Sequence, residues 1–156
     1  MAPADNTALI LRYYEDIWNH GTTALTDEIL CPAFCYYPPD APEGMQSSAT
    51  HKAYVELYRG ILPDLHVMVM AVLADGDKVA VQWTAHGTLQ SDCRGRAPAG
   101  ARVVVRGMDL FHVADDRIAA LHSFFDLLTV RRQVRPRPSC MAWHGTCCSR
   151  HAERMW

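Results

Sequence analysis

Residues 65–89 read LHVMVMAVLADGDKVAVQWTAHGTL and decide the fold class. Valine recurs on both sides of the turn Ala74-Asp75-Gly76-Asp77. Two strand-forming runs joined by an Asp-Gly turn are typical of a β-hairpin. This stretch therefore predicts two antiparallel strands, over 65–73 and 78–89.

The same strand-forming composition continues after this hairpin. Runs over 102–113 and 117–125 are rich in valine and aromatic residues, and they meet at Ala114-Asp115-Asp116. They predict a second hairpin, joined to the first by a Pro-containing loop. A short helix is predicted over 126–133, and Asp126 is expected to cap it because it precedes an apolar turn.

The residues before 64 have helical periodicity instead. An amphipathic helix is predicted over 6–20, since its apolar residues recur at helical spacing. A second helix over 24–30 is stopped by Pro32, and a brief extended piece follows at 34–37. A third helix starts at Ser48 or Thr50 and ends near Pro63.

Helices first and consecutive hairpins after them predict the α+β class, with the three N-terminal helices on one face of an antiparallel sheet. A strongly curved sheet of this kind forms an α+β cone, or cystatin-like roll, that encloses an apolar pocket. The 156 residues are enough for one core without a metal or disulfide. We expect one domain over 1–134 and a C-terminal extension of uncertain structure over 135–156.

Composition excludes several classes of partner. The formal net charge of −2 leaves no basic surplus for a phosphate backbone, so nucleic acid is not an expected partner. No signal peptide and no membrane-spanning run is present, so no membrane partner is expected. Six irregularly spaced cysteines indicate reduced thiols and a cytoplasmic location. The Cys and His residues near the C-terminus match no common zinc spacing, so we expect no metal.

Several stretches together resemble one known family, the SnoaL-like polyketide cyclases. The resemblance covers about residues 6–134 and includes Leu11–Gly21, Cys31–Phe34, Pro63–Leu65, Asp75–Thr88, Arg106–Phe111 and Ile118–Leu128, with Gln133 behind them. It implies membership of the wider nuclear transport factor 2-like superfamily, which includes ketosteroid isomerases and limonene epoxide hydrolases. It also implies a homodimer that forms through the open face of the sheet.

Strand parity selects the side chains that face the pocket, because neighbours on a strand point to opposite faces. Val105, Gly107, Asp109 and Phe111 share one face, and the resemblance places Asp109 on the inner side. The position of the family's catalytic aspartate is held by Ser123. We expect Asp109 to act as a general acid/base with a pKa raised by desolvation, and Ser123 to hydrogen-bond Asp109 or a substrate oxygen. The alternative is that Asp109 only anchors a polar network.

The walls of the pocket are expected to be aromatic and aliphatic. Tyr14, Tyr37 and Trp83 carry polar tips that suit them to orienting a substrate. The resemblance matches Trp18 and Leu57 to positions that orient substrate in related cyclases. Phe111 completes the expected substrate-binding set. Tyr54 and Phe125 are also expected among the walls, with plain core packing as the favoured role for both.

These residues leave three functions open. The first is a cofactor-free cyclase or isomerase that moves a proton on a small hydrophobic, polyketide-like substrate of secondary metabolism. The second is a non-catalytic protein of the same fold that binds a ligand or acts in assembly. The third is an epoxide hydrolase or dehydratase, although the positions of the Arg and second Asp of limonene epoxide hydrolases are held by Trp83 and Ala85.

Overall fold

A computed structural model of the protein describes residues 3–39, 41, 43–90 and 100–133. The helices and helical turns are α1 (Pro3–Arg12), η1 (Tyr13–Asn19), η2 (Thr23–Leu25), α2 (Thr26–Ile29), α3 (Ser48–Ile61) and α4 (Leu127–Gln133). The strands are β1 (Leu30–Tyr37), β2 (Met45–Gln46), β3 (His66–Asp75), β4 (Lys78–Thr88), β5 (Arg102–Ala114) and β6 (Arg117–Phe125). The predicted extension over 135–156, with its Cys and His residues, lies outside the described residues.

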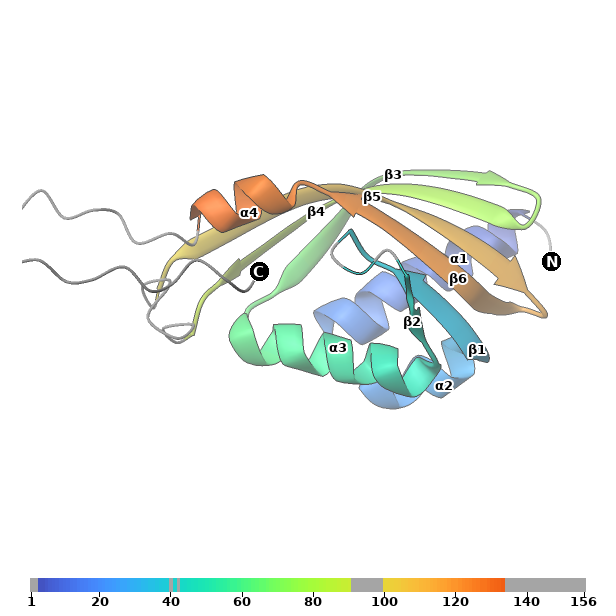
Figure 1. Cartoon of the computed structure of the whole chain (residues 1–156). Helices are drawn as coiled ribbons and strands as arrows, with labels where there is room; N and C mark the ends of the chain where they lie inside the picture. Colours follow the sequence, from blue (N-terminus) through green and yellow to red (C-terminus); the bar gives the residue numbers. More distant parts are fainter. Residues whose placement is uncertain (1–2, 40, 42, 91–99, 134–156) are drawn as a thin grey trace, which may run out of the picture.

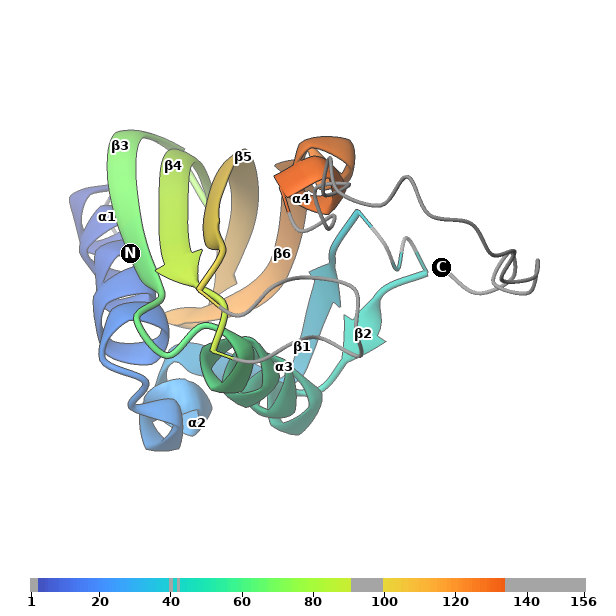
Figure 2. The ribbon, with the colours of Figure 1, turned by 90° about the vertical axis from the view of Figure 1, so that its left-hand side faces the viewer.

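The six strands form one curved, unclosed sheet in the order β2-β1-β6-β5-β4-β3. Helices α1, α2 and α3 lie under its concave face, and α4 lies against the end of the sheet where β5 begins (Figures 1 and 2). This arrangement confirms the α+β prediction of three N-terminal helices packed on one face of a curved sheet. None of the described helices is long and apolar enough to cross a membrane.

Both predicted hairpins are present, because β3 pairs with β4 and β5 pairs with β6 in antiparallel fashion. The first strand differs from the prediction. β1 runs for eight residues from Leu30 rather than only over 34–37, and it pairs with β6 in parallel. Turn signals report pairing between neighbours in sequence, so they carry no information about this long-range parallel pair.

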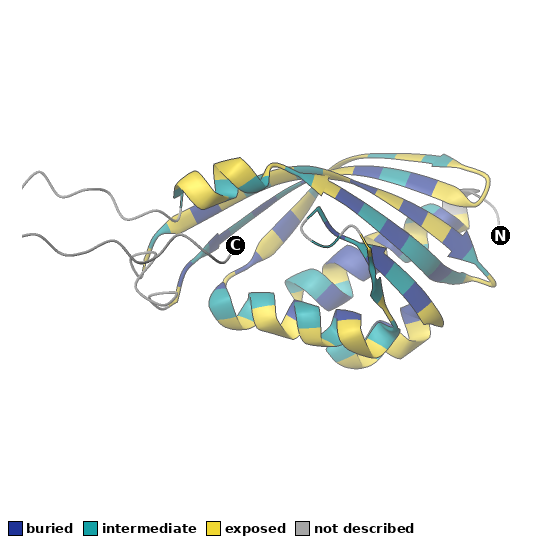
Figure 3. Ribbon diagram, viewed as in Figure 1, coloured by how far each residue is buried: buried dark blue, intermediate teal, exposed yellow. Residues whose placement is uncertain are grey.

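The core lies between the concave face of the sheet and the helices. Along β4, Val79, Val81, Trp83 and Ala85 are buried, and the residues between them are more exposed. Figure 3 shows the same alternation on β5 and β6. This period of two is what a sheet with one covered face produces.

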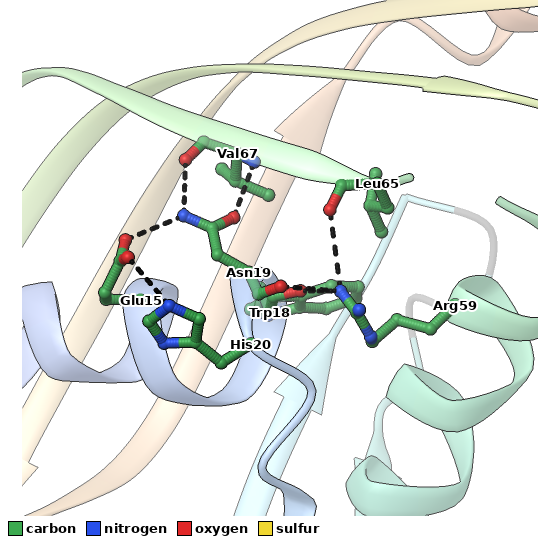
Figure 4. Close-up of polar contacts among 7 residues, drawn as sticks. All are labelled: Glu15, Trp18, Asn19, His20, Arg59, Leu65 and Val67. Atoms are coloured by element: carbon green, nitrogen blue, oxygen red, sulfur yellow. Dashed lines mark hydrogen bonds and ion pairs between the residues drawn. The ribbon is translucent and has the colours of Figure 1, made fainter. Parts of the chain in front are cut away.

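A polar junction fixes the end of η1 against β3 and α3 (Figure 4). Arg59 on α3 donates from Nη1 to the carbonyl oxygens of Trp18 (2.5 Å), Asn19 (3.0 Å) and Leu65 (3.5 Å). The Asn19 side chain accepts from the Val67 N–H (2.7 Å) and donates to the Val67 carbonyl (3.1 Å). The junction therefore satisfies carbonyls at the end of the helical segment and holds the backbone of Trp18 in place.

The predicted cap at Asp126 is confirmed. Its Oδ1 accepts a hydrogen bond from the Thr129 N–H (3.0 Å), which satisfies one of the free donors at the start of α4. At the other end of α4, the Gln133 amide accepts from the Val104 N–H (2.7 Å) and donates to the Val104 carbonyl (2.8 Å). The cap thus closes the first turn of α4, and Gln133 ties the other end of the helix to β5.

Candidate functional site

A cavity of about 150 Å³ lies between the concave face of the sheet and the helices. Eight aromatic side chains line it, namely Tyr13, Tyr14, Trp18, Tyr36, Tyr54, Tyr58, Trp83 and Phe125. Among the described residues of the lining, Asp109 is the one carboxylate, and no Lys, Arg or His is present. The cavity is therefore an apolar, aromatic pocket with one acidic group.

Asp109 lies on the inner face of β5 and is 5% exposed. Its Oδ2 accepts a hydrogen bond of 2.6 Å from the Tyr14 hydroxyl. Ser123 lies directly opposite on β6 in the strand register. Burial raises the pKa of Asp109 above its ordinary value, and the donors Tyr14, Ser123 and Trp83 lower it by a smaller amount. The net result is a carboxyl group that binds its proton more tightly than an exposed aspartate does.

Trp83 and Gly107 complete the surroundings of Asp109. The Trp83 Nε1 and the Asp109 Oδ1 are both buried and form no hydrogen bond of standard geometry, yet the indole N–H lies near enough to lower the pKa of Asp109. A Cβ atom added at Gly107 would lie 2.5 Å from Trp83 Cζ2 and 2.9 Å from the Phe124 carbonyl oxygen. Glycine at 107 therefore leaves the space in which the indole lies beside the carboxyl group.

The turn η1 supplies three side chains of the lining, Tyr13, Tyr14 and Trp18. It is a π-type turn, in which the His20 N–H donates to the Glu15 carbonyl five residues earlier (2.9 Å). Turns of this type are rare and occur frequently at functional sites. Here the neighbours Tyr13 and Tyr14 are both buried, so the turn brings two adjacent phenols to one pocket.

A buried histidine holds one of these phenols. The Nε2 atom of His51 lies 2.9 Å from the Tyr13 hydroxyl, and the imidazole packs among the rings of Phe34, Tyr36 and Tyr54. Burial lowers the pKa of His51 to about 3, so the imidazole is neutral at physiological pH. The pair is a fixed polar element in the wall behind the pocket.

Five of the predicted site residues meet in this pocket. Tyr14, Trp18, Trp83, Asp109 and Ser123 all belong to its lining. The parity prediction for β5 agrees with the structure, since Asp109 is buried and Met108 beside it is 51% exposed.

The structure places the other three predicted residues outside the lining. Tyr37 stacks on His122, with ring centroids 4.4 Å apart, and its neighbour Tyr36 faces the pocket instead. Leu57 is 59% exposed, because the buried stripe of α3 runs through His51 and Val55. Phe111 is fully buried and packs against Tyr13 and Tyr14 behind the pocket.

Sequence reasoning missed several residues that the structure brings to the site. Tyr13, Tyr36 and Tyr58 line the pocket without having been predicted. Tyr54 and Phe125, expected among the walls but with core packing favoured, also line it. No role at the site was predicted for His51 either. The spacing of His51 and Val55, four residues apart on one face of a helix, is the signal that identifies the buried side of α3.

Comparisons with known proteins agree with this fold and pocket. A family model described as SnoaL-like polyketide cyclase matches residues 8–134. Among curated proteins, no sequence matches the chain.

Solved structures of the same fold come from several bacteria. A protein of Jannaschia sp. CCS1, provisionally assigned as a SnoaL-like polyketide cyclase, is 25% identical with a TM-score of 0.78, over 88% of this chain and 98% of that one. A provisionally assigned polyketide cyclase of Xanthomonas campestris pv. campestris is 21% identical (TM-score 0.77, 85% and 98% covered). AclR of Streptomyces galilaeus, provisionally assigned as a hydroxylase, is 22% identical (TM-score 0.74, 85% and 97% covered).

Proposed function

The chain belongs to the SnoaL-like polyketide cyclase family, and from that premise we propose that it is a cyclase- or isomerase-type enzyme in which Asp109 moves a proton on a small hydrophobic, polyketide-like substrate. One observation carries the proposal. Asp109 is buried in an aromatic pocket, with one carboxylate oxygen held at 2.6 Å by Tyr14.

The chemistry follows from this environment. The carboxylate of Asp109 would accept a proton from a carbon next to a substrate carbonyl and return it at another position, which is the step that cyclisation and isomerisation share. A raised pKa suits both halves of this cycle, because a general acid/base is most efficient when its pKa lies near the working pH. The Tyr14 hydroxyl fixes the orientation of the carboxyl group and stabilises its charged form.

The test is the exchange of the α-protons of 1-tetralone in D2O, followed by proton NMR. This probe is apolar and requires only the abstraction and return of a proton. Replacement of Asp109 by Asn should reduce the catalysed exchange by about 100-fold or more, as expected for the loss of a general acid/base. Tyr37→Phe is the matched control and should exchange at the wild-type rate, since Tyr37 lies outside the pocket lining. Wild-type exchange in Asp109→Asn would refute the proposal.

A second candidate is a non-catalytic ligand-binding protein. It is favoured by Asp109 Oδ1, which is buried without a hydrogen-bond partner, and by the hydroxyl of Ser123 at the position where the family resemblance expects an acid. Ligands would then raise the melting temperature while wild-type and Asp109→Asn proteins show the same background exchange.

The homodimer expected from the resemblance stays a prediction. The outer face of the sheet exposes apolar side chains, among them Met108 (51%), Leu110 (38%) and Phe124 (63%), which a second copy would cover. Sedimentation equilibrium should give twice the mass of the chain. A monomer at all concentrations would refute the dimer.

A further inference from the structure

The pocket changes character along its length. Four positions of β5 define its long axis, with Val103 and Val105 at one end, Asp109 further in, and Phe111 behind Asp109. A strand rises about 3.4 Å per residue, so Asp109 lies roughly 14 Å from Val105. The fully buried Phe111 closes the inner end.

The inner end is polar and almost fully enclosed. Asp109 and Ser123 are each 5% exposed, and Tyr14 and Tyr36 are each 4% exposed. The Tyr14 hydroxyl donates to Asp109 at 2.6 Å, and Tyr36 belongs to the same lining. This end therefore offers hydrogen-bond partners to an oxygen-bearing group of a ligand.

The outer end is aliphatic on the side of the sheet and α4. Every side chain that β3, the first half of β5 and α4 bring to the lining is a valine or leucine: Val67, Val103, Val105, Leu127 and Val130. Leu127 and Val130 are only half-buried, so this end of the lining is less enclosed than the end at Asp109. A ligand that reaches this far from Asp109 meets apolar surface.

Helix α4 forms this outer wall and lies apart from the three N-terminal helices. None of its residues is buried, and two hydrogen bonds join the Gln133 side chain to the backbone of Val104 on β5. Figure 2 shows α4 next to β6 and the first part of β5, apart from the three N-terminal helices. The size of its inward side chains therefore limits how far a ligand extends.

Charge limits the ligand as well. Asp109 is the one charged group among the described residues of the lining, and no cation is there to pair with an anionic ligand. An anion that enters this pocket loses its hydration and gains no partner. An uncharged ligand avoids this penalty.

We propose, on the basis of the proposed function, that the substrate is an elongated, uncharged molecule whose oxygenated end lies at Asp109 and whose apolar end lies beneath α4, with Leu127 and Val130 as the residues that set its length. The enzyme thus selects substrates by the reach of their apolar end, and it discriminates against free acids of the same shape.

The test measures binding of 4-alkylphenols, from phenol to 4-hexylphenol, by isothermal titration calorimetry. In the wild type, affinity should rise about fourfold for each methylene that becomes buried. Val130→Trp should weaken the binding of 4-hexylphenol at least tenfold and change the affinity for phenol by no more than about twofold. Leu128→Trp is the matched control, because Leu128 is on the same helix and 54% exposed; it should behave as the wild type.

Two further arms keep the test decisive. Leu127→Phe replaces Val130→Trp if the latter does not fold, and it should shorten the accepted chain in the same way. 4-Hexylbenzoate should bind at least tenfold more weakly than 4-hexylphenol. The inference is overturned if chain length has no effect in the wild type, if the α4 variants weaken phenol and 4-hexylphenol equally, or if the benzoate binds as well as the phenol. Since binding requires no turnover, these results are independent of whether Asp109→Asn abolishes proton exchange.

Discussion

Replacement of Tyr14 by phenylalanine should raise the pKa of Asp109. The substitution removes the hydroxyl that donates to Asp109 Oδ2 at 2.6 Å and keeps the ring that packs against Tyr13 and Phe111. The Tyr14 hydroxyl lowers the pKa of Asp109 because it stabilises the charged form, whereas burial raises it. Without the hydroxyl, fewer groups stabilise the charged carboxylate, so burial raises the pKa of Asp109 further.

The size of the change follows from the strength of this one hydrogen bond. A hydrogen bond to a charged group contributes about 1.5–3 kcal/mol, and a shift of one pKa unit corresponds to about 1.4 kcal/mol. The pKa of Asp109 should therefore rise by about 1–2 units in Tyr14→Phe. Ser123 and Trp83 still lower the pKa of Asp109 in the variant, so the shift reflects the loss of the Tyr14 hydroxyl alone.

The assay is a pH titration of the Asp109 side-chain carboxyl carbon by 13C NMR. The signal is assigned by its loss in Asp109→Asn. Tyr37→Phe is the control for removal of a tyrosine hydroxyl elsewhere, and it should leave the Asp109 titration unchanged. An Asp109 pKa in Tyr14→Phe that equals or lies below the wild-type value would refute this account of the site.

Three other predictions concern stability. Gly107→Ala should destabilise the fold by about 1–3 kcal/mol in urea unfolding, because its Cβ would overlap Trp83 and the Phe124 backbone. Gly60→Ala on α3, where nothing lies within 4 Å of the added Cβ, should instead stabilise by about 0.5–1 kcal/mol; equal effects at the two glycines would contradict the packing argument. Arg59→Ala should lower the free energy of unfolding by about 1–3 kcal/mol, since it removes the donor to three backbone carbonyls. The control Arg12→Ala removes only an exposed contact with Asp16 and should change the free energy of unfolding by less than about 0.5 kcal/mol. His51 has a folded-state pKa of about 3, below its unfolded value, so the unfolded chain binds the extra proton and stability falls as the pH falls below about 6.5. Between pH 7 and pH 5, the free energy of unfolding of His51→Phe should therefore fall by about 2 kcal/mol less than that of the wild type. If the free energies of unfolding of the two proteins changed in parallel with pH, His51 would not be buried as a neutral ring.

The sequence predicted the parts of the fold that local signals govern. The Asp-Gly turn at 75–76 and the valine-rich runs identify the hairpins, because both turn chemistry and alternation act over a few residues. Alternation on β5 also grouped Asp109 correctly with Val105, Gly107 and Phe111, and the family resemblance assigned this group to the inner face, where Asp109 is buried.

The errors at Tyr37 and Leu57 have different physical causes. The buried residues of β1, Leu30, Phe34 and Tyr36, share one parity, so Tyr36 faces inward and Tyr37 faces outward. Tyr37 was selected for its polar tip and not by strand parity, which explains the error. On α3, several apolar residues compete for the buried face. Packing against β1 and η1 selects the stripe through His51 and Val55, which leaves Leu57 outside.

The central claim is that Asp109 is the acid/base of the pocket, and the pH dependence of 1-tetralone exchange in wild type and Tyr14→Phe tests it most directly. Exchange should increase with pH through an inflection that coincides with the Asp109 pKa from 13C NMR, because the carboxylate form accepts the proton. In Tyr14→Phe, the inflection and the NMR pKa should both move up by the same amount. An inflection that stays in place while the Asp109 pKa moves would contradict the claim, since some other group would then be the base.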